Sequence, residues 1–562
     1  THTHTHTHTH TTSSKHHQSN VTLDVLLLHS PTHAHTRQHM KLIHATTALL
    51  STLSSRLTST TATFTTTRRR TSSPLATFTT LPPSFLTRHH SIPPLSLRTS
   101  SSFSSSYTMS SSSSSTNNNP KKCIYLDYNG TTPIDKRVLE TMMPYFTHHF
   151  GNPSSGHYYG IAPKEAVARA RSSILSLLYD TKKEEELERL HNGIIFTGCG
   201  TEADNLAIHL ALQANPTTTS KPHIVTSNVE HPAITQYLQS LESQGVISVS
   251  YVPVNKEGIV PAQDMIQAIQ PNTILVTLML ANNESGALQP IQQVSQYCQT
   301  QNILFHTDAA QAVGKVSVSF TTTDDDNSSY SSSFSIGENN AVVTTQGIGN
   351  AIDMMTIVGH KIGAPKGIAC LYIAPNCFTN KKKVLPKHYM LLGGGQEYGK
   401  RAGTENVPYI VGLGTAADLL MQQTTLEEGG EVVPQWQKNA KHMYALKSRL
   451  YSNLVQALGS DIVRDNGPSS PCHKLPNTLS VGFRNVQSGD LLRNIEMDVA
   501  CSAGSACHAS GGALSAVLVA MDVPLEYARG TLRLSVGPST TLEEVDEASE
   551  IIVGAVRKQL GK

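Results

Sequence analysis

The sequence has few cysteines, little net charge and no long apolar run, and each shortage excludes a class of protein. The 8 cysteines among 562 residues form no C-x-x-C pair, which is too sparse for a disulfide scaffold and gives no sign of a metal site. No run approaches the roughly 20 apolar residues that a membrane helix needs. The formal net charge of +2 provides no general basic field for nucleic acid. We therefore expect no metal, no membrane and no nucleic-acid partner.

Acidic residues are almost absent from the segment 1–120, where Asp24 stands alone among Ser, Thr and His. Such a composition cannot build a packed core, so we expect a disordered, low-complexity tail. A short apolar stretch at 41–50, after Met40, precedes Ser-, Thr- and Arg-rich sequence and predicts a mitochondrial or plastid transit peptide. Translation from Met109 would instead give a cytosolic form.

The rest of the chain, about 440 residues, is long enough for two domains. From 135 to 415, apolar strand patterns alternate with helical patterns, which predicts a large α/β domain with a mostly parallel or mixed sheet. We expect 121–134 and 416–562 to form a smaller α+β domain. Within the large domain, 321–350 is rich in Ser, Thr, Asp and Asn and predicts a low-complexity surface insertion, with a docking role as the alternative.

One lysine, Lys361, stands beside His360 and between glycines, just after an apolar run. A lysine so placed can be desolvated and become nucleophilic. Upstream, the strand-like segment 302–307 leads to Asp308 and then Gln311 in a turn. An amine that holds an aldehyde as a Schiff base, together with a buried acid that keeps a pyridine nitrogen protonated, indicates a pyridoxal phosphate site.

The phosphate of such a cofactor needs a cradle, and the segment 194–203 offers one. A short apolar strand leads to Gly200 and Thr201, which open a helical pattern, so backbone N–H groups would face the anion. An ordinary strand-to-helix turn is the alternative for this segment alone. His231 follows the strand-like segment 223–227, where it would stack on the cofactor ring or serve a structural purpose.

The order of these residues along the chain resembles that of the class V, fold-type I pyridoxal phosphate enzymes. Within that class, it is similar to the cysteine desulfurase and selenocysteine lyase family. The resemblance extends from about Ile124 to the C-terminus and includes Y-L-D-Y-N-G-T-T-P at 125–133, G-N-P-S-S at 151–155 and R-A-G-T-E-N at 401–406. It implies the fold-type I transferase fold, with a large domain built on a mostly parallel mixed sheet and a smaller C-terminal α+β domain. It also implies a homodimer whose active sites are shared across the interface.

The resemblance gives each candidate residue a role. Lys361 would hold the cofactor and shuttle protons, and Asp308 would pair with the pyridinium nitrogen. Gln311 would bond to the phenolic oxygen of the ring, on which His231 would stack. The phosphate would be held by Gly200, Thr201, His360 and, from the neighbouring subunit, Thr404. The substrate carboxylate would be bound by Asn283 and by Arg533, whose planar guanidinium suits bidentate binding.

Cys507 lies in a run of small residues, 501–512, that has no apolar period and predicts a mobile loop. A thiol on such a loop can swing to a bound substrate, and the resemblance implies that Cys507 is the catalytic cysteine. Cys501 matches no catalytic position of the family and is expected to pack in the loop or the core.

Two branches of the family divide the prediction of function. Val358 and His508 resemble the selenocysteine lyase branch, since many cysteine desulfurases carry a serine where Val358 stands. We therefore predict a selenocysteine lyase that removes selenium from L-selenocysteine and leaves L-alanine and selenide. The alternative is a cysteine desulfurase that forms a persulfide on Cys507 and releases L-alanine, for Fe–S cluster or thiolation pathways. Either enzyme would pass its product to an acceptor protein.

Two other classes of protein are alternatives. A class V aminotransferase would keep Lys361 and Asp308 but would have no use for a mobile thiol at Cys507. A non-catalytic sulfur-relay scaffold would not need the complete set of cofactor residues.

Overall fold

The computed structural model describes residues 122–179, 183–215, 220–320, 332–336, 341–345, 349–375, 377–379, 383–386, 389–426, 430–503 and 514–562. The predicted tail with its transit peptide lies outside these residues, and so does the predicted catalytic loop after Ala503, with Cys507 and His508. All that follows concerns the compact unit formed by the chain from Ser113 to Lys562.

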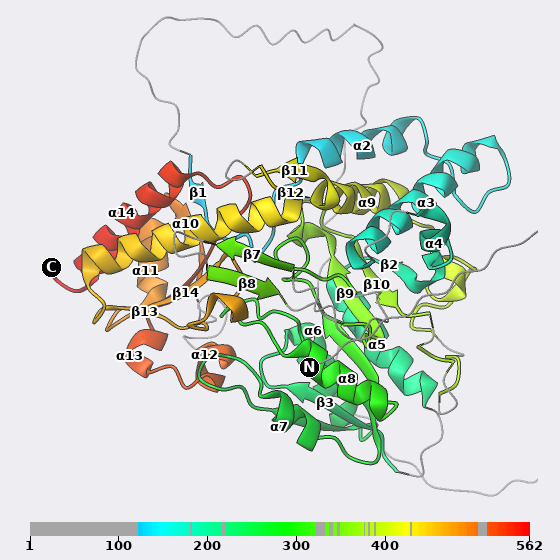
Figure 1. Ribbon diagram of the computed structural model, residues 1–562, viewed down its shortest axis with the longest axis horizontal. Helices are drawn as coiled ribbons and strands as arrows, with labels where there is room; N and C mark the ends of the chain where they lie inside the picture. Colours follow the sequence, from blue (N-terminus) through cyan, green and yellow to red (C-terminus); the bar gives the residue numbers. More distant parts are fainter. Residues whose placement is uncertain are drawn as a thin grey trace, which may run out of the picture. The chain divides into compact units, whose positions relative to one another are not determined.

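A seven-stranded mixed sheet lies at the centre of the larger part (Figure 1). All neighbouring strands from β9 to β4 run parallel, and only β10 runs against its two neighbours. The strands in sheet order are β2 (Ile194–Thr197), β10 (Ala369–Ile373), β9 (Met354–Val358), β6 (Leu304–Asp308), β5 (Thr273–Thr277), β3 (His223–Ser227) and β4 (Ser248–Val252). The predicted mostly parallel sheet of a fold-type I enzyme is therefore confirmed.

Helices cover both faces of this sheet. They are α2 (Lys136–Thr147), α3 (Tyr158–Leu178), α4 (Glu184–Glu188), α5 (Gly200–Ala214), α6 (Pro232–Ser243), α7 (Ala262–Gln267), α8 (Ile291–Thr300) and α9 (Val407–Met421). Along β2, Ile194 and Phe196 belong to one apolar core with α3, α8 and α9, whereas Ile195 belongs to another with α5 and α6. Successive side chains of a strand point to opposite faces, so a sheet covered on both sides needs apolar residues at almost every position.

A smaller antiparallel sheet is built from the C-terminal part of the chain. Its order is β13 (Val463–Asp465), β14 (Thr478–Phe483), β17 (Thr531–Ser535) and β16 (Ser502–Ala503). α10 (Gln435–Leu458) and α14 (Leu542–Gln559) lie side by side and pack on it through an apolar core of their own, which includes Leu450, Phe483 and Ile552 (Figure 1). β1 (Ile124–Tyr125) pairs in parallel with β15 (Val499–Ala500), so the start of the described chain lies against this C-terminal part.

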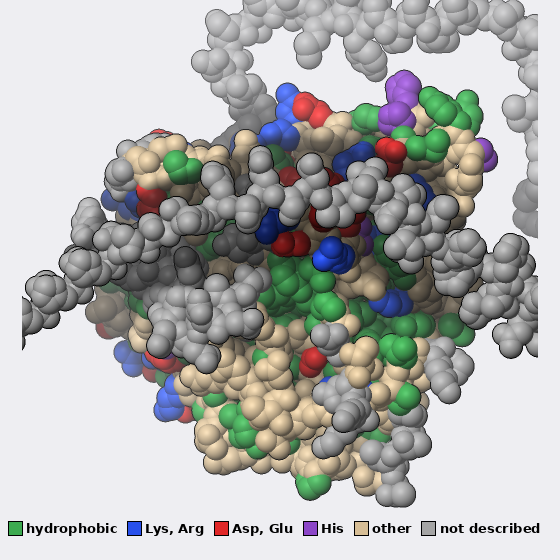
Figure 2. Space-filling view, turned by 45° about the vertical axis from the view of Figure 1, so that its right-hand side comes forward, with side chains coloured by type: hydrophobic (Ala, Val, Ile, Leu, Met, Phe, Trp, Pro, Cys, Tyr) green, Lys and Arg blue, Asp and Glu red, His purple; other side chains and the backbone are tan. Residues whose placement is uncertain are grey.

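Short elements complete the described fold. They are α11 (Ser488–Ile495), α12 (Ala516–Ala520), α13 (Leu525–Ala528), the hairpin strands β11 (Gln423–Thr425) and β12 (Val432–Pro434), and the 3₁₀ turns η1 (His191–Gly193), η2 (Gly359–Lys361), η3 (Glu397–Gly399) and η4 (Pro471–His473). In the described ranges, no helix combines the length and the apolar character needed to cross a bilayer. On the face drawn in Figure 2, acidic and basic side chains of the described residues lie mixed.

The structure differs from the predicted domain limits in one respect. α9 runs without a break from Val407 to Met421, so the expected boundary after Thr415 falls inside a helix. Ala416, Ala417 and Leu420 are buried in the core of the large sheet, together with Val517 of α12. Because this apolar helix is buried along its length, no domain boundary falls between its residues. The core of the large sheet therefore includes residues from both predicted segments.

The expected low-complexity insertion also contains regular structure. β7 (Ser332–Ile336) and β8 (Ala341–Thr345) form an antiparallel hairpin within 321–350. The prediction from composition missed these two strands. The Val and Thr residues of β8 are residue types with a high strand propensity and were the available signal.

Candidate active site

The predicted site residues follow the carboxyl ends of parallel strands, which meet at one edge of the large sheet. β2 leads to Gly200 and Thr201, β3 leads to His231, β6 ends at Asp308, and β9 leads to Lys361. A cavity of about 410 Å³ lies at this edge. Its lining includes Gly200, Thr201, His231, Asn283, Asp308, Gln311, His360, Lys361 and Arg533. Tertiary structure therefore brings together predicted residues that are more than 300 positions apart in sequence.

Lys361 ends the 3₁₀ turn η2 and is partly buried in the cavity wall. Its Nζ donates to the backbone oxygen of Asn129 over 2.5 Å and to that of Gly130 over 2.7 Å. Burial, helped by the positive charge of Arg533, lowers the pKa of Lys361 to about 8, against the opposing pull of nearby carboxylates. A substantial fraction of the amine is then uncharged near neutral pH, which is the form that attacks an aldehyde.

Asp308 is the last residue of β6 and is 7% exposed. Its carboxylate accepts the backbone N–H of Ala310 over 2.9 Å. Burial raises the pKa of Asp308, whereas that hydrogen bond and the charges of His231 and Lys361 lower it. A protonated ring nitrogen placed against this carboxylate would be attracted more strongly than in water, because the surroundings have a low dielectric constant.

A second carboxyl group, Asp204, lines the same cavity and was missed by the sequence analysis. It lies in α5, one helical turn after Gly200, and that spacing is the signal that points it toward the same side. Its Oδ1 is buried without a hydrogen-bond partner among the described residues. Burial, and next the negative charge of Asp308, raise the pKa of Asp204 well above its ordinary value. A protonated Asp204 leaves Asp308 as the anionic member of the two.

His231 caps the N-terminus of α6, where its Nδ1 accepts the backbone N–H of Ala233 over 3.1 Å. This hydrogen bond assigns the proton of the neutral ring to Nε2. The ring is reached by solvent at the cavity, yet the surrounding protein lowers the pKa of His231 by desolvation. A neutral ring that lines the cavity suits the predicted stacking on a cofactor ring.

The N-terminus of α5 forms the anion cradle of the cavity. Gly200 is the first residue of this 15-residue helix, and Thr201 follows it. A Cβ atom at Gly200 would lie 2.6 Å from Cγ2 of Val358, so only glycine allows the helix to begin this close to β9. Unpaired N–H groups and the helix dipole favour a phosphate here.

His360 borders the cavity as a neutral ring. Burial, followed by the charges of Lys361 and Lys366, lowers the pKa of His360 to about 4. Its Nδ1 lies 3.1 Å from Oγ1 of Thr131. A neutral imidazole at this position can donate one hydrogen bond to an anion without bringing a second charge next to Lys361.

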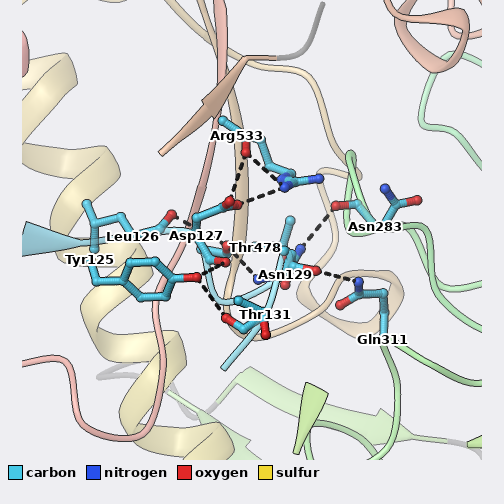
Figure 3. Close-up of polar contacts among 12 residues, drawn as sticks. Tyr125, Leu126, Asp127, Asn129, Thr131, Asn283, Gln311, Thr478 and Arg533 are labelled. Atoms are coloured by element: carbon cyan, nitrogen blue, oxygen red, sulfur yellow. Dashed lines mark hydrogen bonds and ion pairs between the residues drawn. The ribbon is translucent and has the colours of Figure 1, made fainter. Parts of the chain in front are cut away.

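The substrate end of the cavity is marked by Arg533 on β17. Its Nη2 donates to Oδ1 of Asp127 over 2.7 Å and to Oγ of Ser502 over 3.1 Å (Figure 3). The Nε atom is buried without a hydrogen-bond partner among the described residues. A carboxylate in the cavity would meet the guanidinium of Arg533, which lines the wall. The neighbouring Asn283 is fixed by its backbone oxygen, which accepts Nδ2 of Asn129 over 3.1 Å.

Asn129 connects these groups, although the sequence analysis gave it no role. It is 1% exposed, and its backbone oxygen accepts both Nζ of Lys361 and, over 3.0 Å, Nε2 of Gln311 (Figure 3). Its side chain donates to Oγ1 of Thr478 over 2.8 Å and accepts Nδ2 of Asn477 over 3.0 Å. The available signal was its place in the motif at 125–133, where polar residues interrupt a strand.

One predicted site residue, Thr404, is not among the residues that line the cavity. Thr404 is exposed, precedes α9 and is not part of the cavity wall, so its predicted role in a neighbouring subunit stays a prediction. Cys507 lies outside the described residues. Cys501 packs against the smaller core, and burial raises its pKa to about 12, which leaves it a protonated, poorly nucleophilic thiol.

The groups of the cavity fit pyridoxal phosphate. Lys361 provides the amine for the aldehyde, Asp308 the buried carboxylate for the ring nitrogen, and the start of α5 the phosphate cradle. Only glycine at the start of that helix allows the cradle to lie this close to Val358.

The family model of aminotransferase class-V matches residues 124–334 and 343–548. The cysteine desulfurase of Trichormus azollae is 35% identical over 438 residues, which cover 77% of this chain and 93% of that protein. The cysteine desulfurase IscS of Clostridium botulinum is 35% identical over 441 residues, covering 78% of this chain and 95% of the relative. A cysteine desulfurase of Pongo abelii is 34% identical over 436 residues, or 77% of this chain and 82% of that protein.

Solved structures give the same picture. A NifS-like protein is similar with a TM-score of 0.61 and 29% identity, over 77% of this chain and 99% of that structure. A structure described as SspA in complex with cysteine is similar with a TM-score of 0.54 and 29% identity, over 74% of this chain and 99% of that structure.

Proposed function

Because the chain belongs to the class V, pyridoxal phosphate-dependent family of cysteine desulfurases and selenocysteine lyases, we propose that it is a cysteine desulfurase. The reaction would convert L-cysteine to L-alanine and transfer the sulfur atom to a thiol of the enzyme. One observation carries the proposal: Lys361, Asp308 and Arg533, an amine, a buried carboxylate and a guanidinium, line one cavity. Relatives named cysteine desulfurase, matched over more than three quarters of the chain, support the choice of substrate.

Selenocysteine lyase, the function favoured by the sequence analysis, becomes the second candidate. The observation in its favour is Val358, which lines the cavity beside Gly200 with an apolar side chain where many cysteine desulfurases carry serine. His508, the other residue that favoured this branch, lies outside the described residues. Because the matched relatives are named cysteine desulfurase, we place cysteine before selenocysteine as the proposed substrate.

Each residue of the cavity would have its own role in the proposed reaction. When bound, pyridoxal phosphate supplies a ring that takes up negative charge from the substrate carbons. Lys361 would hold the aldehyde of the cofactor and, once freed, its amine, with a pKa of about 8, would move protons at the substrate carbon atoms. Asp308 would keep the ring nitrogen protonated, and His231 would pack on the ring.

Arg533 and Asn283 would orient the substrate. Asp127 and Ser502 hold Nη2 of Arg533 in place, so a substrate carboxylate would meet a guanidinium already fixed in orientation.

Sulfur transfer is assigned to Cys507 by the sequence alone. Its thiolate would attack the substrate sulfur, so that the C–S bond breaks as an S–S bond forms. The β-carbon would keep the electron pair of the broken bond and take up a proton. L-alanine would then leave. We further propose a homodimer in which Thr404 reaches the phosphate of the neighbouring site, and an acceptor protein that takes the sulfur from Cys507.

The test is alanine formation by the full chain from L-cysteine and from L-selenocysteine, side by side. We expect turnover of L-cysteine, with loss of that activity in Lys361→Ala. Turnover of selenocysteine with cysteine acting only as an inhibitor would replace the proposal by the lyase. A requirement for a keto acid acceptor would indicate an aminotransferase. A protein without the visible absorption of the cofactor would be a scaffold.

A further inference from the structure

A second buried lysine, Lys315, lies close to the active site and has no part in the chemistry described above. Its side chain is 5% exposed. Its Nζ donates to the backbone oxygen of Gln311 over 3.1 Å and to the side-chain Oε1 of the same residue over 3.2 Å. One amine therefore binds two acceptors of a single residue, which lies four positions earlier in the chain.

These contacts determine which way the amide of Gln311 points. A lysine ammonium has three N–H donors and no acceptor, so it must face Oε1 and not the NH₂ group of the amide. The NH₂ group is thereby turned to the other side, where Nε2 donates to the backbone oxygen of Asn129 over 3.0 Å. That same oxygen accepts Nζ of Lys361, so the donor end of Gln311 lies beside the reactive amine.

We infer that Lys315 is a positioning residue, which holds the Gln311 amide so that its N–H donors face the cofactor next to Lys361. The acceptor follows from the chemistry of pyridoxal phosphate. Its phenolic oxygen is attached to the ring carbon next to the one that bears the aldehyde, and Lys361 binds the aldehyde. A donor beside Lys361 is therefore placed to bind the phenolic oxygen, whereas the opposite amide orientation would present a carbonyl oxygen and repel it.

The proposal distinguishes Lys315 from a lysine buried for packing alone. Lys447 is similarly buried, at 7% exposed, and donates to the backbone oxygen of Leu475 over 3.0 Å. Burial lowers the pKa of both lysines to about 7, with a further contribution from another lysine in each case. Lys447 does not line the cavity, so it provides a matched control for the cost of removing a buried amine.

The experiment titrates pyridoxal phosphate into the apo form of the full chain and records the visible absorption as a function of pH. Lys315→Met should weaken cofactor binding about tenfold, because a hydrogen bond to a charged group is lost. The pH midpoint of the absorption change should move upward by about one unit, since a phenolate that loses a donor holds a nearby proton more tightly. Lys447→Met should leave both quantities unchanged.

A double-mutant cycle with Gln311→Ala separates positioning from the mere loss of a positive charge. If Lys315 acts through Gln311, adding Lys315→Met to Gln311→Ala produces no further shift in the midpoint. An equal shift in both backgrounds would mean a direct electrostatic effect and would overturn the inference, as would an unchanged midpoint in a folded Lys315→Met protein.

Lys315→Gln serves if the methionine variant does not fold. Its amide retains an N–H donor toward Gln311, so we expect a smaller shift of the midpoint than in Gln311→Ala. A shift as large as in Gln311→Ala would contradict the inference.

The inference rests on the cofactor and not on the choice between cysteine and selenocysteine. Absence of turnover with cysteine would refute the proposed function and leave this titration unaffected.

Discussion

Arg533 and Asp127 form a partly buried ion pair, with 2.7 Å between Nη2 and Oδ1, although they are 406 positions apart in sequence. Asp127 precedes the segment that carries Asn129, and Arg533 lies on the last strand of the smaller sheet. The pair therefore joins the first and the last parts of the described chain at the cavity (Figure 3). It fixes the orientation of a guanidinium that lines the cavity.

Replacing that guanidinium tests its role in substrate binding. Arg533→Lys should raise KM for L-cysteine by about 10- to 100-fold with a smaller effect on kcat, because an ammonium cannot bind a carboxylate bidentately. Steady-state alanine formation measures both constants. Arg484→Lys, at an exposed arginine whose Nη2 lies 3.7 Å from Glu526, is the control and should change neither constant. An equal effect of the two variants would refute the assignment.

Gly200 should be sensitive to a single added methyl group. In Gly200→Ala, the new Cβ would lie 2.6 Å from Cγ2 of Val358, so the start of α5 must move away from β9. We expect pyridoxal phosphate to bind roughly tenfold more weakly, as the phosphate cradle is displaced. Val358→Ala removes the atom in conflict, and the double variant should recover most of the affinity. Failure of this rescue would place the cause elsewhere.

The pKa of Lys361 predicts how cofactor uptake depends on pH. The uncharged amine is the reactive form, and burial lowers its pKa from 10.5 to about 8. The rate at which the apo protein takes up pyridoxal phosphate should rise about tenfold per pH unit below that value and level off above it. Stopped-flow absorption measures the rate, with Lys361→Ala as the control. A rate that climbs steadily to pH 10 would show an ordinary, unshifted lysine.

Thr404 offers a test of shared active sites. In a mixed dimer of Lys361→Ala and Thr404→Ala chains, one site regains every wild-type residue if Thr404 acts across the interface. At limiting pyridoxal phosphate, a random equimolar mixture should be more active than either parent and regain roughly a quarter of the wild-type activity, because about half of the dimers are mixed and each of those has one intact site of two. If Thr404 acts within its own chain, mixing brings no gain. Light scattering on the same samples gives the oligomeric state.

Two cysteines of the same short segment are expected to behave differently. Cys507→Ala should abolish persulfide formation and alanine release from L-cysteine. Cys501→Ala should retain most of the activity, because burial raises the pKa of Cys501 to about 12 and removes it as a nucleophile. Mass spectrometry of the protein after brief exposure to cysteine locates the added sulfur. A persulfide on Cys501 would reverse the assignment.

Much of the site could be predicted from the sequence because each residue follows a recognisable local pattern. Gly200, His231, Asp308 and Lys361 come directly after apolar strands, and residues at the ends of parallel strands meet at one edge of a sheet. Strand and turn patterns are local, so β3 was expected over 223–227, the range it occupies. The mixed, mostly parallel sheet followed from the same alternation of strands and helices.

The tertiary structure decided what no local pattern contains. The hydrogen bonds around Asn129, the raised pKa of Asp204 beside Asp308, and the contact of Lys315 with Gln311 all depend on which side chains become buried together. Likewise, α9 continues past the expected domain boundary because both of its ends are packed in one core. The sequence by itself determined the residue types and their order along the strands; burial and contact in the folded chain determined their charges, partners and orientations.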